Sequence, residues 1–273
     1  MTSSTMAQAT NSIEYLEGSL MPHAKFLSKS YVLAQSRYRW VGQFTKNKVV
    51  LDAGCGSGYG AARLASGGAR KVYGIDISAK AIDYCRASYH QNNLNFTEGD
   101  ITKLNFPDCF FDTIVAFEVI EHIKEYPKVI GEFYRLLKPS GRLVISTPNK
   151  LLYSPGTNKP FYPFHWREFY LDDLKYALRR FNLQDIWGQY IKGQEKAPYP
   201  AWHPERNVRI IFANLPRALK LTVVRLYLKI FFWLARNGIH RPRTLKLSDA
   251  YLSRDLDGAL AFVAVCQKPY KKI

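Results

Sequence analysis

Between residues 48 and 149, short apolar runs alternate with segments whose apolar residues recur at helical spacing. The apolar runs predict strands in KVVLDAG, RKVYGIDIS, LNFTEGDI, FDTIVAFEV and GRLVISTPN. The segments between them predict helices in GYGAARLASGGA, AKAIDYCRASYHQNN and YPKVIGEFYRLLKP. Strands that alternate with helices of about a dozen residues are typical of a parallel sheet with helices on both faces. A helix or two within residues 23–44 precedes this α/β core.

After Asn149 the alternation loosens. Residues 150–169 are rich in Pro, Gly and aromatic residues and predict an ordered loop or lid. Then come a predicted helix, LDDLKYALRRF, and two predicted strands, NLQDIWGQYI and ALAFVAVCQK. We therefore expect a flexible leader at 1–22, a ligand-binding core at 23–150, and a lid and acceptor-binding segment of the same domain at 151–273.

Composition limits the class of protein. The 273 residues are 47% hydrophobic, which suffices for one large domain or for a domain with an appendage. The four cysteines form no Cys-x-x-Cys pair, so neither a disulfide framework nor a thiolate metal site is indicated, and a reducing cytoplasm is expected. Net charge is +17, and most of it lies after residue 150, where 21 Lys and Arg face 9 Asp and Glu. An anionic partner is expected there.

A glycine loop follows the first strand of the core. Gly54, Gly56 and Gly58 lie between a strand and a helix, so the backbone must come close to a ligand or another element. Dinucleotide enzymes use similar loops, but there the turn receives a pyrophosphate. Asp52, directly before the glycines, would repel that group. The loop therefore favours a ligand with a cationic end.

Two further acids end the next two strands. Asp76 lies 24 residues after Asp52, where a carboxylate can accept both hydroxyls of a ribose. Asp100 follows the third strand and could receive an adenine amino group, with Ile101 against the ring. A nucleoside that carries an ammonium and a sulfonium but no phosphate fits all three positions. That ligand is S-adenosylmethionine.

The motifs VLDAGCGSGYG, VYGIDIS, FTEGDITKLNF, FDTIVAFEVIEHI and LLKPSGRLVISTPN resemble, in the same order, those of class I S-adenosylmethionine-dependent methyltransferases. The resemblance covers about residues 45–150. It implies a Rossmann-like, doubly wound, three-layer α/β/α fold with a seven-stranded sheet whose last strand is antiparallel. It also implies that the glycines line the methionine moiety, Asp76 the ribose and Asp100 the adenine. The expected cofactor set is Asp52, Gly54, Gly56, Gly58, Asp76, Ile77, Asp100, Ile101 and Phe117.

A second group of functional residues follows the fourth strand. Glu118, Glu121 and His122 are spaced i, i+3 and i+4, so a helical turn would place them on one face. His165, on the loop after the fifth core strand, is expected at the same sheet edge. Two carboxylates and two imidazoles suit Mg²⁺, Mn²⁺ or Zn²⁺. The alternatives are that His122 acts as a general base without a metal, or that these residues are structural.

This Glu-x-x-Glu-His pattern, with a later His, is similar to the metal-binding pattern of small-RNA 2′-O-methyltransferases and ubiquinone-pathway O-methyltransferases. The resemblance implies Glu118, Glu121, His122 and His165 as metal ligands, with Glu121, His122 and His165 catalytic. The stretch from GYG to PFHWREF resembles methyltransferases of polysaccharide and glycolipid assembly. We therefore expect O-methylation of a sugar hydroxyl on a glycan or lipid-linked saccharide. Arg37 or Arg39 is expected to pair with the methionine carboxylate.

Other functions stay open at this stage. They are O-methylation of a quinone precursor or another small molecule, RNA 2′-O-methylation, and a non-enzymatic cofactor-binding module that acts through its basic segment. That segment, around 217–236, carries basic residues on one side of a helical wheel and apolar residues on the other. Such a helix suits the inner face of an anionic membrane, and equally a helix that covers the protein's own core or forms a dimer. Binding of this segment to nucleic acid is a third, less favoured alternative.

Overall fold

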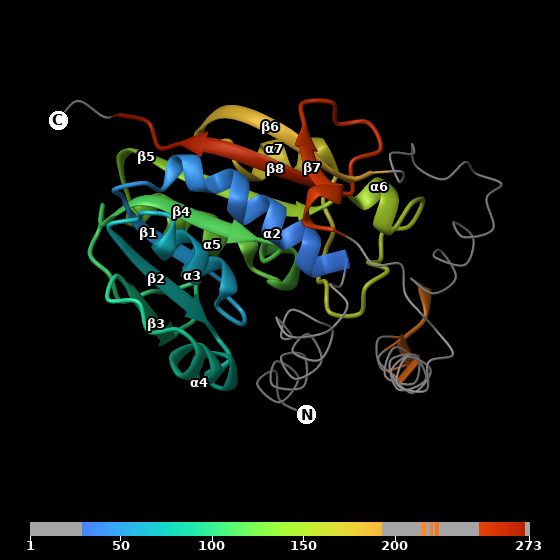
Figure 1. The fold of residues 1–273 in the computed structure, drawn as a ribbon. Helices are drawn as coiled ribbons and strands as arrows, with labels where there is room; N and C mark the ends of the chain where they lie inside the picture. Colours follow the sequence, from blue (N-terminus) through green and yellow to red (C-terminus); the bar gives the residue numbers. More distant parts are fainter. Residues whose placement is uncertain (1–28, 193–213, 217–218, 221, 224–245, 271–273) are drawn as a thin grey trace.

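Eight strands of the described residues form one mixed sheet in the order β3-β2-β1-β4-β5-β8-β6-β7 (Figure 1). The computed structural model describes residues 29–192, 214–216, 219–220, 222–223 and 246–270. The strands are β1 (Val49–Ala53), β2 (Lys71–Asp76), β3 (Leu94–Glu98), β4 (Phe111–Phe117), β5 (Leu137–Pro148), β6 (Asn182–Ile191), β7 (Ala250–Ser253) and β8 (Ala261–Gln267). The helices are α2 (Lys29–Val41), α3 (Tyr59–Ser66), α4 (Ala79–Ser88), α5 (Tyr126–Leu136), α6 (Lys150–Tyr153) and α7 (Leu171–Ala177), with 3-10 turns η1 (Gly42–Phe44), η2 (Ile120–His122) and η3 (Leu247–Asp249).

The sheet confirms the expected α/β architecture and corrects its strand count. Strands β1 to β5 pair in parallel, and β8 runs antiparallel between β5 and β6, as expected for the closing strand. The eighth strand, β7, was not predicted and pairs antiparallel with β6 at the sheet edge. With only four residues between polar segments, β7 is too short to show a periodic pattern.

Two apolar cores lie on opposite faces of this sheet. One is formed with α5 and α7 and includes Val129, Phe133 and Leu174. The other lies under α2, α3 and α4 and includes Val41 and Leu64. Figure 1 shows α2 crossing in front of the central strands and α5 behind them. The fold is therefore the three-layer arrangement that the alternating pattern predicts.

Local sequence signals place the helix ends near the sheet edges. Ser78 caps α4, because its hydroxyl accepts a hydrogen bond from the Ala81 amide at 3.3 Å. Gly67 follows the last residue of α3 and caps its carboxyl end. The segment around Ser140, at φ +61°, protrudes from β5, so the pairing with β4 shifts register there. Of these signals, the Ser78 cap lies at the carboxyl edge of the parallel strands, directly after β2.

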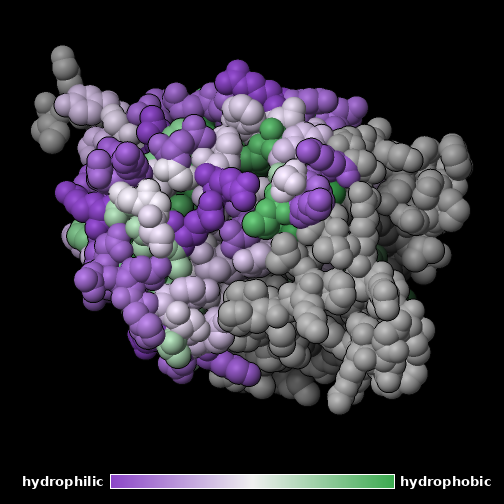
Figure 2. All heavy atoms as spheres, viewed as in Figure 1, coloured by the Kyte–Doolittle hydropathy of each residue, from purple (hydrophilic) through white to green (hydrophobic). Residues whose placement is uncertain are grey.

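Two predicted segments lie mainly outside the described residues. They are the leader at 1–22 and most of the basic segment at 217–236, of which Leu219, Lys220, Thr222 and Val223 are described and helical. Within the described ranges, no helix has the length and apolar character that crossing a membrane requires. Where described residues form the surface on the face that carries α2, hydrophilic residues dominate and hydrophobic ones form small separate groups (Figure 2).

Gly60→Ala is expected to lower stability by about 1–3 kcal/mol, the usual cost of overpacking. A Cβ at Gly60 would lie 2.0 Å from Cζ of Tyr38, so the buried Tyr38 ring or the helices α2 and α3 would have to shift. Thermal unfolding should show a fall of roughly 2–4 °C per kcal/mol. Gly42→Ala is the control, because a Cβ at Gly42 meets nothing within 4 Å. Equal midpoints for the two variants would contradict this packing.

Candidate active site

The glycine loop lies at the carboxyl edge of β1, and all three predicted glycines have positive φ, at +72° for Gly54, +52° for Gly56 and +77° for Gly58. A Cβ at Gly58 would lie 2.6 Å from Sγ of Cys85, so the loop is pressed against α4 there. At Gly56 an added Cβ meets nothing within 4 Å. The middle of the loop therefore presents backbone to open space, as a ligand-binding turn requires.

Asp52 is completely buried beneath this loop. Its Oδ1 accepts a hydrogen bond from the Tyr38 hydroxyl at 2.9 Å, and the backbone amide of Ala61 also acts on the carboxylate and lowers its pKa. Burial raises the pKa of Asp52 to about 7, the charge of Asp76 adds to this rise, and the Tyr38 hydrogen bond opposes it. Tyr38 also packs edge-on against Phe117, with ring centroids 5.1 Å apart. No described cationic side chain forms an ion pair with this buried carboxylate, so it is suited to a cationic ligand.

Asp76 connects the end of β2 to the glycine loop. Its Oδ2 accepts a hydrogen bond from the Gly56 amide at 2.9 Å, and its Oδ1 accepts one from the Ser78 amide at 3.0 Å. The neighbouring Ile77 is 53% exposed and so is accessible to a flat ligand. The predicted nucleoside position at the end of β2 therefore has both a carboxylate and an apolar surface.

Asp100 and Ile101 differ in accessibility. Asp100 is exposed after β3 and accepts a hydrogen bond from the Thr102 amide at 2.8 Å. Ile101 is only 7% exposed and belongs to the core on the α5 face of the sheet. Asp100 is thus accessible from solvent, whereas most of the Ile101 side chain is engaged in the core.

Arg37, on α2, reaches this edge and is buried, whereas Arg39 is exposed. The Arg37 guanidinium donates a hydrogen bond to Oε1 of Gln189 and lies 3.6 Å from Oε1 of Glu118. Glu118 has a left-handed backbone at φ +56°, and its carboxylate accepts a hydrogen bond from the Ser146 hydroxyl at 2.7 Å. The Glu118 carboxylate is therefore engaged with Ser146 and Arg37.

Glu121, His122 and His165 come together at the same edge. One potential ligand atom from each lies within 4.8 Å of the others. Glu118 does not join them, which corrects the expectation of a shared helical face. The reason is local: the chain after β4 forms the short 3-10 turn η2, which begins only at Ile120, and Glu118 precedes it with left-handed backbone. Among the described residues the structure thus groups three of the four predicted metal ligands.

Hydrogen bonds orient both imidazoles of this group. Nδ1 of His122 lies 3.3 Å from the carbonyl oxygen of Phe164, and Nδ1 of His165 lies 3.0 Å from Oε1 of Glu168. Because a carbonyl and a carboxylate only accept, each Nδ1 must carry the proton in these bonds. In a neutral ring the lone pair is then on Nε2. This is the tautomer in which histidine binds metals when its other nitrogen is held by an acceptor.

Sequence reasoning missed three supporting residues. Tyr38 holds Asp52, Thr147 donates a hydrogen bond to Oε2 of Glu121 at 3.1 Å, and Glu168 holds His165. Glu168 follows His165 by three residues, which was a usable signal. Tyr38 and Thr147 act across strands and helices, so the sequence held no local signal for them.

Comparison with known proteins agrees with this geometry. Residues 51–145 match the family model described as a methyltransferase domain. A protein of Mycolicibacterium smegmatis, named "Probable S-adenosylmethionine-dependent methyltransferase", is 34% identical over 226 residues, which cover 81% of each chain. A ubiquinone biosynthesis O-methyltransferase of Coxiella burnetii is 38% identical over 107 residues, covering 38% of this chain and 45% of the relative.

A solved structure shares the fold. The [4+2]-cyclase SpnF superposes with a TM-score of 0.63 and 18% sequence identity, covering 99% of this chain and 98% of that one. At this identity the likeness concerns the fold alone. The reaction must therefore be argued from the relatives and from the site.

Proposed function

We propose, from the premise that this chain belongs to the S-adenosylmethionine-dependent methyltransferases, that it methylates a hydroxyl of a sugar with the help of a divalent metal ion. Family membership supports the methyl donor and the enzymatic reaction. The observation that carries the rest is the group formed by Glu121, His122 and His165 at the edge where the glycine loop lies.

The donor would be held by the predicted cofactor residues. The backbone of Gly54, Gly56 and Gly58 would approach the methionine moiety, and the carboxylate of Asp52 would provide the compensating charge. The ribose hydroxyls would bind Asp76. S-adenosylmethionine supplies a methyl group on a positively charged sulfur that is already activated for displacement. The protein must therefore position the acceptor and remove its proton.

The adenine side of the donor would lie between Ile77 and Asp100. The exposed Ile77 side chain would pack on the ring, and the accessible Asp100 carboxylate would accept from the amino group. Ile101 and Phe117 would support the pocket from behind, because both are nearly buried.

The metal proposal follows from the donor atoms. One buried carboxylate and two imidazoles with Nε2 lone pairs form a three-ligand set that suits Mn²⁺ or Zn²⁺ and leaves positions for oxygen ligands. A bound ion would supply Lewis acidity and favour ionisation of an acceptor hydroxyl. A three-ligand set also favours an acceptor with two adjacent oxygens. Without an ion, Nε2 of His122 is suited to accept the proton.

The residues beside Glu121, His122 and His165 favour a sugar over other diols as the acceptor. Trp166, next to His165, is 48% exposed, and Nζ of Lys124 lies 5.6 Å from its ring centroid. An exposed indole is a stacking surface for the C–H face of a sugar ring. The alternative acceptor is a quinone precursor, which the name of the Coxiella relative suggests. An acceptor carried on a lipid would also give the basic segment at 217–236 a membrane partner.

Transfer of labelled methyl from S-adenosylmethionine to fractionated cell extract would identify the acceptor. We expect label in a saccharide or lipid-linked saccharide fraction, recovered as a methyl ether of a sugar after acid hydrolysis. Label recovered only in quinone precursors or only in RNA would contradict the sugar proposal. Liposome flotation with and without anionic lipid, on the same protein, would separately test the basic segment.

Glu168→Gln should weaken divalent-metal binding about 10–100-fold, the usual effect of removing an outer carboxylate behind a histidine ligand. Glutamine can still accept from Nδ1 of His165, so the ring should keep its orientation but lose the neighbouring charge. Binding of Mn²⁺ by equilibrium dialysis measures this. Glu125→Gln, an exposed carboxylate paired with Lys128, is the matched control. Equal Mn²⁺ affinity in both variants would argue against His165 as a ligand.

A further inference from the structure

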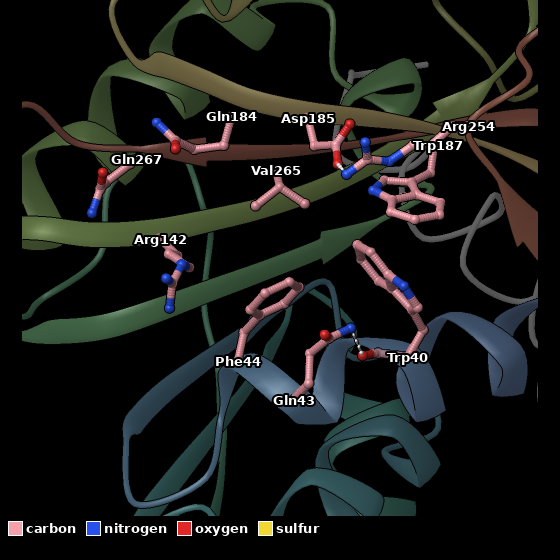
Figure 3. Close-up of a pocket in the computed structure, with 10 residues that line it drawn as sticks. All are labelled: Trp40, Gln43, Phe44, Arg142, Gln184, Asp185, Trp187, Arg254, Val265 and Gln267. Atoms are coloured by element: carbon pink, nitrogen blue, oxygen red, sulfur yellow. Dashed lines mark hydrogen bonds and ion pairs between the residues drawn. The ribbon is translucent and has the colours of Figure 1, made fainter.

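A groove with a volume of about 350 Å³ lies on the α2 face of the sheet (Figure 3). Val265 of β8 is at its centre, between the end of α2 with η1 on one side and β6 on the other. At the groove, Arg142 of β5 lies opposite Gln267 of β8 in the sheet register. Pro148, at the end of β5 that lies near the candidate active site, is opposite Ala261. At ~3.3 Å per residue the two ends are ~20 Å apart. The groove is thus separate from the candidate active site.

Aromatic rings form the walls of this groove. Trp40 and Phe44 reach toward the sheet from α2 and η1, and Trp187 faces them from β6 (Figure 3). The ring centroids of Trp40 lie 5.3 Å from Phe44 and 5.6 Å from Trp187. All three side chains are only half-buried. The groove therefore offers flat apolar surfaces to a ligand rather than a closed core.

Planar polar groups surround these rings. Asp185 and Arg254 are paired at 2.9 Å, and the Nε2 groups of Gln43 and Gln267 donate to backbone carbonyls. From the described residues the amide oxygens of Gln43 and Gln267 receive no hydrogen bond, and Gln184 is exposed beside them. Hydroxyl groups, which both donate and accept, can bind such a mixed rim.

The charge of the groove argues against a polyanion. The guanidinium carbons of Arg142 and Arg254 lie 5.3 and 5.2 Å from the ring centroids of Phe44 and Trp187, so both cations stack on aromatic rings. The Asp185 carboxylate compensates the charge of Arg254. Nucleic acids are bound through several uncompensated Lys and Arg side chains, which this groove lacks among its lining residues.

We propose that this groove binds a neutral saccharide, one or two sugar rings long, with C–H faces on the tryptophans and hydroxyls on the amides and the Asp185–Arg254 pair. Its volume lies within the range of small-molecule sites. The role of this binding rests on the proposed function, because a glycan acceptor would then be held at a second point ~20 Å from its methylated ring. The proposal that the ligand is a neutral saccharide depends only on the residues that line the groove.

The indole N–H signals of the five tryptophans in the ¹⁵N-labelled full-length chain provide the test. Single Trp→Phe variants assign the signals. The probes are neutral hexasaccharides of α-linked glucose and of α-linked mannose. We expect saturable shifts at Trp40 and Trp187 with at least one of them. Because Trp166 lies beside His165, its signal reports separately on the candidate active site.

Gln184→Ala, at an exposed position, should weaken this binding about two- to tenfold, the loss of one hydrogen bond. Asn105→Ala, another exposed amide, is the control and should leave it unchanged. Shifts confined to Trp166 would overturn the groove proposal while supporting a sugar acceptor. No saturable shift at Trp40 and Trp187 with either probe, or equal affinity in both variants, would also overturn it.

Discussion

Glu121→Gln is expected to reduce methyl transfer by about 10²–10⁴-fold while the chain keeps its fold and its affinity for S-adenosylmethionine. The carboxylate of Glu121 is fully buried, so its charge is costly unless a cation compensates it. Glutamine removes that charge and can still accept from the Thr147 hydroxyl. Steady-state methyl transfer, donor titration calorimetry and thermal unfolding would be measured on one preparation.

Glu118→Gln is the matched control for this variant. It changes the same kind of group three residues earlier, but Glu118 binds Ser146 and Arg37 instead of joining the histidines. Its metal stoichiometry should equal that of the unmodified chain, whereas that of Glu121→Gln should fall. If both variants kept a full equivalent of metal, or if Glu121→Gln kept full activity, the role of Glu121 would be wrong.

Asp52→Asn is expected to stabilise the cofactor-free chain at pH 8 by up to about 4 kcal/mol and to weaken donor binding. Burial raises the pKa of Asp52 from 3.8 to about 7. The unfolded chain ionises this group above about pH 4, and the folded chain only near pH 7, so its contribution to stability falls as pH rises between these values. Asparagine keeps the hydrogen bond from Tyr38 without this cost.

The same carboxylate should make donor binding depend on pH. Ionised Asp52 attracts the cationic donor, so affinity for S-adenosylmethionine should rise as pH increases through about 7. In Asp52→Asn this rise should vanish and affinity at pH 8 should fall about 10–100-fold, as for a charge-assisted hydrogen bond. Calorimetry at pH 5.5 and pH 8 measures both effects. A donor affinity that is the same in the two proteins at both pH values would show that Asp52 does not compensate the ligand's charge.

The fold was predictable to the extent that its elements are periodic or capped. The strands around Leu51, Ile75 and Ile114 are short and mainly apolar, and Ser78 and Gly67 mark helix ends. The strand Ala250–Ser253 was missed because four residues carry no periodicity, and its position depends on pairing with β6. Long-range pairing is a tertiary property that a local pattern does not contain.

The candidate site, like the fold, was predictable from the sequence only in part. The spacing of Glu121 and His122 and the aromatic context of His165 were visible in the sequence. The exclusion of Glu118 was not, because it depends on a left-handed backbone at the end of β4 and on partners from β5 and α2. The tautomers of His122 and His165 likewise depend on Phe164 and Glu168, which tertiary contacts bring into place.

The most direct test is methyl transfer to a saccharide fraction by protein from which divalent metal has been stripped, followed by stepwise addition of Mn²⁺ or Zn²⁺. We expect stripping to abolish the formation of sugar methyl ethers. We also expect activity to return in proportion to added metal and to level off at one equivalent per chain. Full transfer by the stripped protein, or transfer that never yields a methylated sugar, would contradict it.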